Sequence, residues 1–174
     1  MITPTEISVG ELEKLEHLFQ NSIFPLLIYP EHQTNLSRLS MVLKYLDSSR
    51  RSQELGLKIS FYCMCFESLF STDTTELSHK ISERIAFFLG ETPETRVKIY
   101  QNVKSAYSIR SKVVHGDNIS SKSFEQMLEV ALFCDNTLRN ILNEIFSSEK
   151  YFQIFQSDTK TLERFLIDLT FGVH

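Results

Sequence analysis

The sequence predicts a soluble, all-α protein with six or seven helices in a single domain that spans residues 1–174. Apolar residues recur at intervals of three and four, which is the helical period, and not at intervals of two, as in a strand. Glycine (5) and proline (4) are scarce, which argues against a β-sandwich rich in tight turns. Hydrophobic residues make up 42% of the chain, which is enough for a core and argues against a disordered chain.

Helix-breaking residues divide the first half of the chain into three predicted helices. The first covers residues 10–23 and ends before Pro25. The second runs from Asn35, which can cap it, to the arginine pair that ends at residue 51, where cations suit the helix dipole. The third, residues 55–70, is apolar almost all round, so we expect it to be the most buried helix.

Four further helices are predicted in the second half of the chain, at about residues 76–89, 93–114, 124–145 and 159–171. The expected capping residues at their starts are Asp73 with Glu76, Thr92 before Pro93, and Ser123 with Gln126. The glycines at positions 90 and 116 are expected to end the first two of these helices.

Charge and cysteine content restrict the classes of function. The formal net charge is −4, so any nucleic-acid binding must use a local basic patch. The cysteines, Cys63, Cys65 and Cys134, lack paired spacing and are predicted to be buried thiols of a cytoplasmic protein. No signal peptide, no membrane span of about 20 residues and no phosphate-binding glycine loop is recognisable. We therefore expect no membrane contact and no cofactor.

The stretch from Arg96 to His115 differs from the rest of the chain, because it holds five lysines and arginines and no acid. One face of the predicted helix carries residues spaced by three and four, namely Tyr100, Val103, Tyr107, Arg110 and Val114. An arginine beside a tyrosine face suits phosphate contact and base stacking. The alternative is a core helix whose basic side chains only extend to the solvent.

Arg110 and His115, with four residues between them, match the R-x4–6-H motif of HEPN domains, the higher-eukaryote and prokaryote nucleotide-binding superfamily. Three blocks extend the likeness, at residues 66–70 (FESLF), 76–86 (ELSHKISERIA) and 107–116 (YSIRSKVVHG). In their order and spacing, these blocks resemble the ApeA-like HEPN branch over about residues 36–142. Serine at position 111 is usual in that branch, whereas many active HEPN members have Asn or Asp there.

The resemblance implies an antiparallel helical bundle that often pairs as a homodimer. Active members are metal-independent endoribonucleases, in which the 2′-hydroxyl of the RNA attacks the adjacent phosphate. On the match, Arg110 would hold and neutralise the phosphate and His115 would transfer protons. The function implied is that of a toxin or antiphage effector, with RNA as substrate and an antitoxin or other regulatory partner. Other members are inactive modules that bind RNA, a nucleotide or a protein, and this alternative stays open.

The predicted supporting or RNA-binding residues are Ser111, Lys112, Tyr107, Lys104, Tyr100 and Glu67. Glu67 is a carboxylate on an apolar helix, and it could orient Arg110 or His115 or face the solvent. Five positions on a straight helix correspond to about 140° of rotation, so the arginine and the histidine do not share a face. Either the helix unwinds by Gly116 and turns His115 inward, or two chains supply the pair across an interface.

Two other groups of polar residues have simpler interpretations. Arg84, with Glu76 and Glu83, is predicted to lie on a solvated, charged face of its helix. His79 and Glu83 are one helical turn apart, but two ligands do not make a zinc site, so we expect no metal site.

Overall fold

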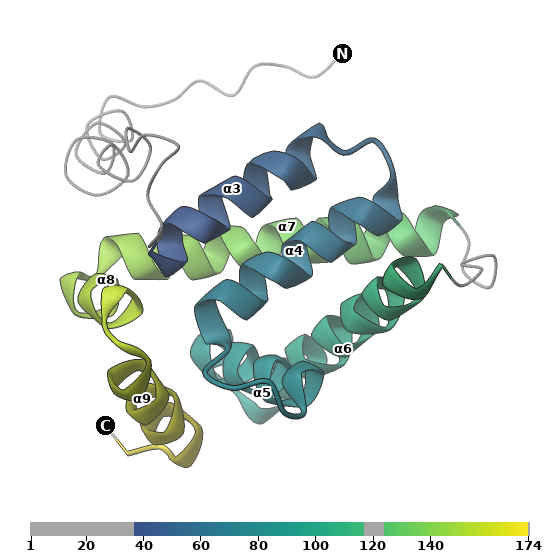
Figure 1. Ribbon diagram of the computed structural model, residues 1–174. Helices are drawn as coiled ribbons and strands as arrows, with labels where there is room; N and C mark the ends of the chain where they lie inside the picture. Colours follow the sequence, from purple (N-terminus) through teal and green to yellow (C-terminus); the bar gives the residue numbers. More distant parts are fainter. Residues whose placement is uncertain (1–36, 117–123, 174) are drawn as a thin grey trace, which may run out of the picture. The chain divides into compact units, whose positions relative to one another are not determined.

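The computed structural model describes residues 37–116 and 124–173, and all regular secondary structure in these ranges is helical. The described helices are α3 (Arg38–Arg51), α4 (Leu55–Phe70), α5 (Leu77–Leu89), α6 (Pro93–His115), α7 (Phe124–Ser147), α8 (Glu149–Gln156) and α9 (Thr159–Phe171). They form an all-α bundle, as the period of the apolar residues predicts (Figure 1). All the described helices belong to one compact unit, which begins at Ser37. The predicted helix at 10–23 and the predicted caps Asn35 and Ser123 lie outside the described residues.

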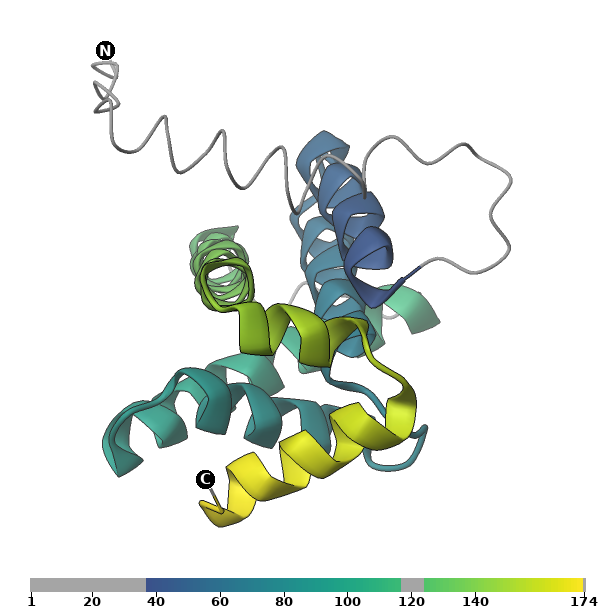
Figure 2. The ribbon, with the colours of Figure 1, turned by 90° about the vertical axis from the view of Figure 1, so that its left-hand side faces the viewer.

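Helix α4 lies at the centre of the bundle and packs against α3, α5, α6 and α7 (Figures 1 and 2). It has more buried residues than any other described helix, which confirms the prediction from its apolar surface. Cys63 and Cys65 point to different sides of α4, and both are buried because neighbouring helices cover those sides. Cys134 on α7 is also a buried free thiol. Among the described helices, none is both long and apolar enough to cross a bilayer.

Aromatic side chains gather where α4, α5, α8 and α9 meet. Phe70, Phe88 and Phe155 pack edge to face, with 5.6 Å between the ring centroids of each pair. Tyr151 and Phe165 extend this aromatic cluster toward α9. The cluster is one use of the 14 phenylalanines, and it fixes the C-terminal helices to the end of α4.

Helix α8 is an element that the sequence analysis did not predict. It has eight residues and follows α7 after a single residue, Ser148, whose hydroxyl accepts a hydrogen bond from the Tyr151 backbone N–H. No proline or glycine marks the boundary, so the two helices look like one in the sequence. The fully buried Phe155 anchors α8 in the aromatic cluster.

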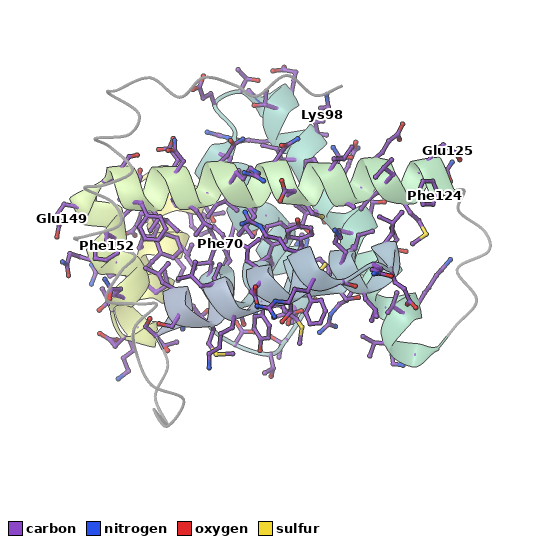
Figure 3. The ribbon with its side chains drawn as sticks, turned by 90° about the horizontal axis from the view of Figure 1, so that it is seen from above. Phe70, Lys98, Phe124, Glu125, Glu149 and Phe152 are labelled. Carbon is purple, nitrogen blue, oxygen red and sulfur yellow. The ribbon has the colours of Figure 1, made fainter. Side chains whose placement is uncertain are left out.

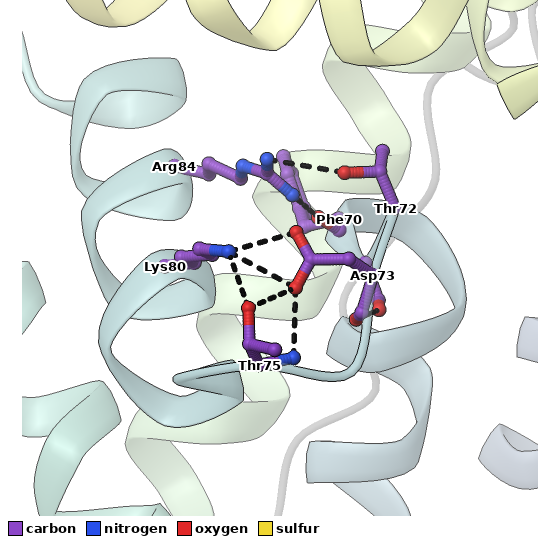
Figure 4. A network of polar contacts seen from close by, with 7 residues as sticks. Phe70, Thr72, Asp73, Thr75, Lys80 and Arg84 are labelled. Carbon is purple, nitrogen blue, oxygen red and sulfur yellow. Dashed lines mark hydrogen bonds and ion pairs between the residues drawn. The ribbon is translucent and has the colours of Figure 1, made fainter. Parts of the chain in front are cut away.

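The turn between α4 and α5 differs from the predicted capping box. Glu76, rather than Asp73, directly precedes α5, with a left-handed backbone (φ 49°) and no capping bond from its side chain. The Asp73 carboxylate instead accepts a hydrogen bond from the Thr75 backbone N–H at 2.8 Å and bonds from Lys80 Nζ at 2.8 and 3.0 Å (Figure 4). The hydrogen bonds from Lys80 and Thr75 lower the pKa of Asp73 to about 2. The carboxylate therefore ties the turn to α5 through a lysine and does not cap the helix.

Arg84 is buried, so its predicted place on a solvated charged face is wrong. Its Nη1 atom donates a hydrogen bond to the Phe70 carbonyl oxygen, and its Nη2 atom donates to Thr72 Oγ1 at 3.2 Å (Figure 4). Phe70 is the last residue of α4, where the carbonyls have no partner within the helix and a cation is favourable. Arg84 on α5 thus caps the C-terminal end of α4.

Replacing Arg84 with alanine is expected to lower the free energy of unfolding by about 1–3 kcal/mol, because the Phe70 carbonyl loses its charged donor. Arg51→Ala is the matched control, since the Arg51 side chain is 80% exposed and forms an ion pair with Asp47 one turn away. That substitution should change the free energy of unfolding by less than about 0.5 kcal/mol. Urea unfolding measures both variants, and equal midpoints would contradict the capping role.

Candidate active site at the end of helix α6

Helix α6 runs without interruption from Pro93 to His115 and carries most of the predicted site residues. Thr92 and Thr95 start it with reciprocal hydrogen bonds between side chain and backbone N–H, at 3.0 and 3.3 Å, as a capping box does. Gly116 ends the helix in a left-handed conformation (φ 71°) that favours glycine. His115 therefore lies in the last turn of regular helix, which excludes the alternative of unwinding before Gly116.

Arg110 reaches from α6 to Glu67 in the last turn of α4. The Arg110 Nη2 atom lies 3.2 Å from Glu67 Oε1 and donates a hydrogen bond to Oε2 at 3.4 Å. The two side chains are 31% and 20% exposed, so the pair lies at the edge of the core. Burial raises the pKa of the Glu67 carboxyl, and Arg110 lowers it in part. Of the roles left open for Glu67, contact with Arg110 is the one that the structure shows.

Tyr107 lies in the core between α6 and α4. It is buried, and its hydroxyl donates a long hydrogen bond of 3.5 Å to the Cys63 carbonyl oxygen. Burial raises the pKa of the Tyr107 hydroxyl well above its ordinary value. The ring holds α6 against α4 and offers no open face for stacking on a base, which the sequence analysis had expected of it.

Arg110 and His115 lie on different faces of α6. The face of Arg110 is the one that packs on α4, because it includes the buried Val103 and Tyr107. His115 shares an exposed face with Ser111, which lies four positions earlier. Since the helix is regular between them, the arginine and the histidine are separated by about 140° around its axis. One chain therefore presents the two side chains in different directions.

Tyr100 and Lys104, two further predicted site residues on α6, both form hydrogen bonds with α5. The Tyr100 hydroxyl lies 2.8 Å from His79 Nδ1, and Lys104 Nζ donates to Ser78 Oγ at 2.9 Å. The sequence analysis missed the pairing of His79 with Tyr100, because it joins residues on two helices and has no local spacing. No group of three potential metal ligands occurs in the described ranges.

Apolar side chains are exposed around the end of α6. Val114 is 61% exposed and Phe124 is 66% exposed, and Leu57 at the start of α4 is exposed as well. The starts of α4 and α7 and the end of α6 border a groove of ≈ 520 Å³, whose lining includes Leu57, Val113, Phe124 and Met127. Figure 3 shows Phe124 at the end of α7 that is remote from α8. Exposed apolar side chains that lie close together can form part of a protein–protein contact.

Comparison with known proteins finds no family model that matches the chain, and no curated protein and no solved structure that matches it. The HEPN resemblance therefore stays a prediction that rests on the three blocks and on the Arg110 and His115 motif. Lys112, another predicted supporting residue, is half-buried on α6.

The raised pKa of Glu67 has a consequence for stability. Below the ordinary carboxyl pKa of 4.5 the protonated Glu67 stabilises the fold, and this contribution is lost as the pH rises through the raised pKa. The free energy of unfolding of the wild type, minus that of Glu67→Gln, should therefore decrease from acid to neutral pH. Urea unfolding of both proteins at a series of pH values measures this difference in the free energy of unfolding.

Glu94→Gln is the control with the opposite sign. Backbone and side-chain hydrogen bonds in the first turn of α6 lower the pKa of Glu94, so its contribution is present above the ordinary carboxyl pKa and is lost as the pH falls. The wild-type advantage over Glu94→Gln should increase with pH. Slopes of the same sign for both variants would contradict the burial of Glu67.

Proposed function

We propose that this protein is a HEPN-type, metal-independent endoribonuclease that cleaves RNA by attack of the 2′-hydroxyl on the adjacent phosphate. The observation that carries the proposal is the position of the Arg110 and His115 motif at the end of α6. Arg110 is oriented there by Glu67, and His115 is exposed. By resemblance, its role is that of a cytoplasmic toxin or antiphage effector, restrained by an antitoxin or another regulatory partner.

The nucleophile is the substrate's own 2′-hydroxyl. The cysteines are poor candidates, because all three are buried and burial raises the pKa of each thiol, that of Cys65 to about 12. RNA carries a hydroxyl beside each phosphate, and DNA does not. A protein that only binds, polarises and exchanges protons can therefore cleave RNA.

Arg110 would stabilise the charge on the phosphate, and His115 would transfer protons. A guanidinium has five N–H donors, so the contact of Arg110 Nη2 with Glu67 is compatible with a second contact to phosphate oxygens. Positive charge there stabilises the charge that develops on the phosphorane. His115 would take the proton of the 2′-hydroxyl or give one to the leaving 5′-oxygen. Ser111 is exposed on the same face as His115, and Lys104 and Lys112 add positive charge along the helix.

The catalytic pair is proposed to form across a two-fold homodimer. Within one chain about 140° separate Arg110 and His115, and the helix does not unwind to bring them together. A two-fold contact uses the same patch twice, so the arginine of one chain can meet the histidine of the other. The exposed apolar residues Val114, Phe124 and Leu57 next to the motif suit such an interface.

A catalytically silent module that binds RNA, a nucleotide or a protein is the second candidate. The contact between Arg110 and Glu67 favours it, because a carboxylate already neutralises the arginine. In this case the motif would stabilise the fold and would take no part in a reaction. The two candidates differ in whether purified protein cleaves RNA.

Replacing His115 or Arg110 with alanine is expected to lower the rate of RNA cleavage by about 10²- to 10⁴-fold, because each supplies proton transfer or charge stabilisation to the transition state. Arg164→Ala on α9 is the matched control, since this arginine is exposed and lies outside the site. The rates are measured with mixed RNAs, with and without chelator. Chelator should have no effect, the products should end in a 2′,3′-cyclic phosphate, and DNA should stay intact.

Cleavage by His115→Ala at the wild-type rate would refute the mechanism. Wild-type protein that binds RNA without cutting it would favour the silent module.

Mixing two inactive variants tests whether the pair forms across the dimer. In a heterodimer of Arg110→Ala with His115→Ala, one site has lost both residues, and the other keeps the arginine of one chain and the histidine of its partner. After exchange of subunits, an equal mixture should recover about a quarter of the wild-type rate, because half of the dimers carry one intact site of two. Adding Phe124→Glu to both chains should abolish the recovery. A mixture as inactive as its components would place the pair within one chain.

A further inference from the structure

A stripe of residues on α6 extends from His115 back toward the start of the helix. Its members are separated by three, four or seven positions, that is, by about one or two helical turns, and therefore face one direction. They are Val97, Tyr100, Lys104, Ser111 and His115. Arg110 is not among them, because its face packs on α4. At its far end this α6 stripe meets α5, where a groove lies between the two helices.

The groove between α5 and α6 has a volume of ≈ 500 Å³, and most of its surface is apolar. Phe87 forms part of its wall, and the Arg96 guanidinium lies over the Phe87 ring, 4.7 Å from the centroid. Val97 lines the groove and is 55% exposed, so the groove is open to solvent. A concave, mainly apolar site with a few polar groups is the usual form of a ligand-binding site.

The polar groups at the groove suit a flat molecule that donates hydrogen bonds from its edge. The lining includes the Tyr100 ring, which can stack, and the side chains of Glu83 and Gln101. A carboxylate accepts hydrogen bonds and repels phosphate, and an amide both donates and accepts. This set matches a nucleobase, which has a flat apolar face and amino or imino donors at its edge.

Cationic and donor groups lie next to the groove along the α6 stripe. His79 Nδ1 lies 2.8 Å from the Tyr100 hydroxyl, and Lys104 Nζ lies 2.9 Å from Ser78 Oγ, so both pairs join α5 to α6. These side chains can contact the backbone of a strand whose base enters the groove. In sites for single-stranded nucleic acid, polar groups that contact the backbone lie beside a separate surface on which a base stacks. His79 and Lys104 would be the backbone contacts here, and the groove would hold the base.

The geometry points to the groove between α5 and α6 as a nucleobase subsite for a single RNA strand that follows the α6 stripe. Tyr100 precedes His115 by about 22 Å along the helix, so the subsite would hold a nucleotide several positions from the cleaved bond. The assignment of RNA as the ligand rests on the proposed function. Glu83 in the groove lining can accept hydrogen bonds from the edge donors of a base. Arg96, the cation of the same lining, lies over the Phe87 ring and donates a hydrogen bond from Nε to the Gly90 carbonyl oxygen at 2.8 Å.

Binding is tested with two 2′-O-methyl oligonucleotides of about 10 nucleotides, one with bases and one fully abasic. Neither has a free 2′-hydroxyl, so binding is separated from cleavage. Fluorescence anisotropy should show that the wild type binds the oligonucleotide with bases about ten-fold or more tightly than the abasic one, because base stacking is lost in the latter. Val97→Glu fills the groove with charge at an exposed position and should remove this difference.

Ile167→Glu on α9 is the matched control, since it places the same charge at another exposed apolar residue, and it should keep the wild-type difference. The abasic oligonucleotide reports any electrostatic effect of Val97→Glu on the backbone alone. A base-dependent difference that persists in Val97→Glu would overturn the subsite, as would a wild type that binds neither oligonucleotide or both equally. Those results do not bear on the proposed cleavage, which has its own assay. Base-dependent binding together with a lack of cleavage would support the subsite and favour the silent module over the nuclease.

Discussion

The unbroken register of α6 is the constraint on which the candidate site depends. The helix starts at a threonine capping box and stays regular through His115, and the left-handed Gly116 ends it. Because the helix is regular, the sequence position of a residue determines the side of α6 on which it lies. Arg110 therefore faces α4 and His115 faces the solvent. The same register aligns the exposed face of His115 with the groove between α5 and α6. If α6 ended one turn earlier, His115 would lie outside the helix, and the helical register would no longer set its direction.

The position of Arg110 depends in turn on the end of α4. Arg84 on α5 binds the carbonyl of Phe70, the last residue of α4, and Glu67 lies one turn earlier and binds Arg110. A buried, charged capping contact and a half-buried ion pair thus connect α5, α4 and α6 in series. Burial raises the pKa of Glu67, and the neighbouring Arg110 guanidinium opposes this shift by favouring the charged carboxylate. The core thereby limits where the guanidinium can point.

Features with local causes could be predicted from the sequence, and features made by tertiary contacts could not. The Thr92 cap of α6 and the burial of α4 follow from residue spacing and were predicted. The capping role predicted for Asp73 was wrong because Lys80 binds its carboxylate, and Arg84 was misplaced because its partner is on another helix. Helix α8 was missed because no breaking residue separates it from α7. In the candidate site, the Arg110 and His115 motif could be recognised from the sequence. The choice of Arg110 as the partner of Glu67 could not be predicted, because it depends on how α4 packs on α6.

The central claim is that one chain cannot complete the site and two chains can. The most direct measurement is a dilution series of the wild-type protein, with the cleavage rate per chain and the mass from light scattering recorded at each concentration. If the site is shared, the rate per chain should fall in proportion to the fraction of dimer and vanish for the monomer. A rate per chain that stays constant while the mass falls to that of the monomer would contradict the claim.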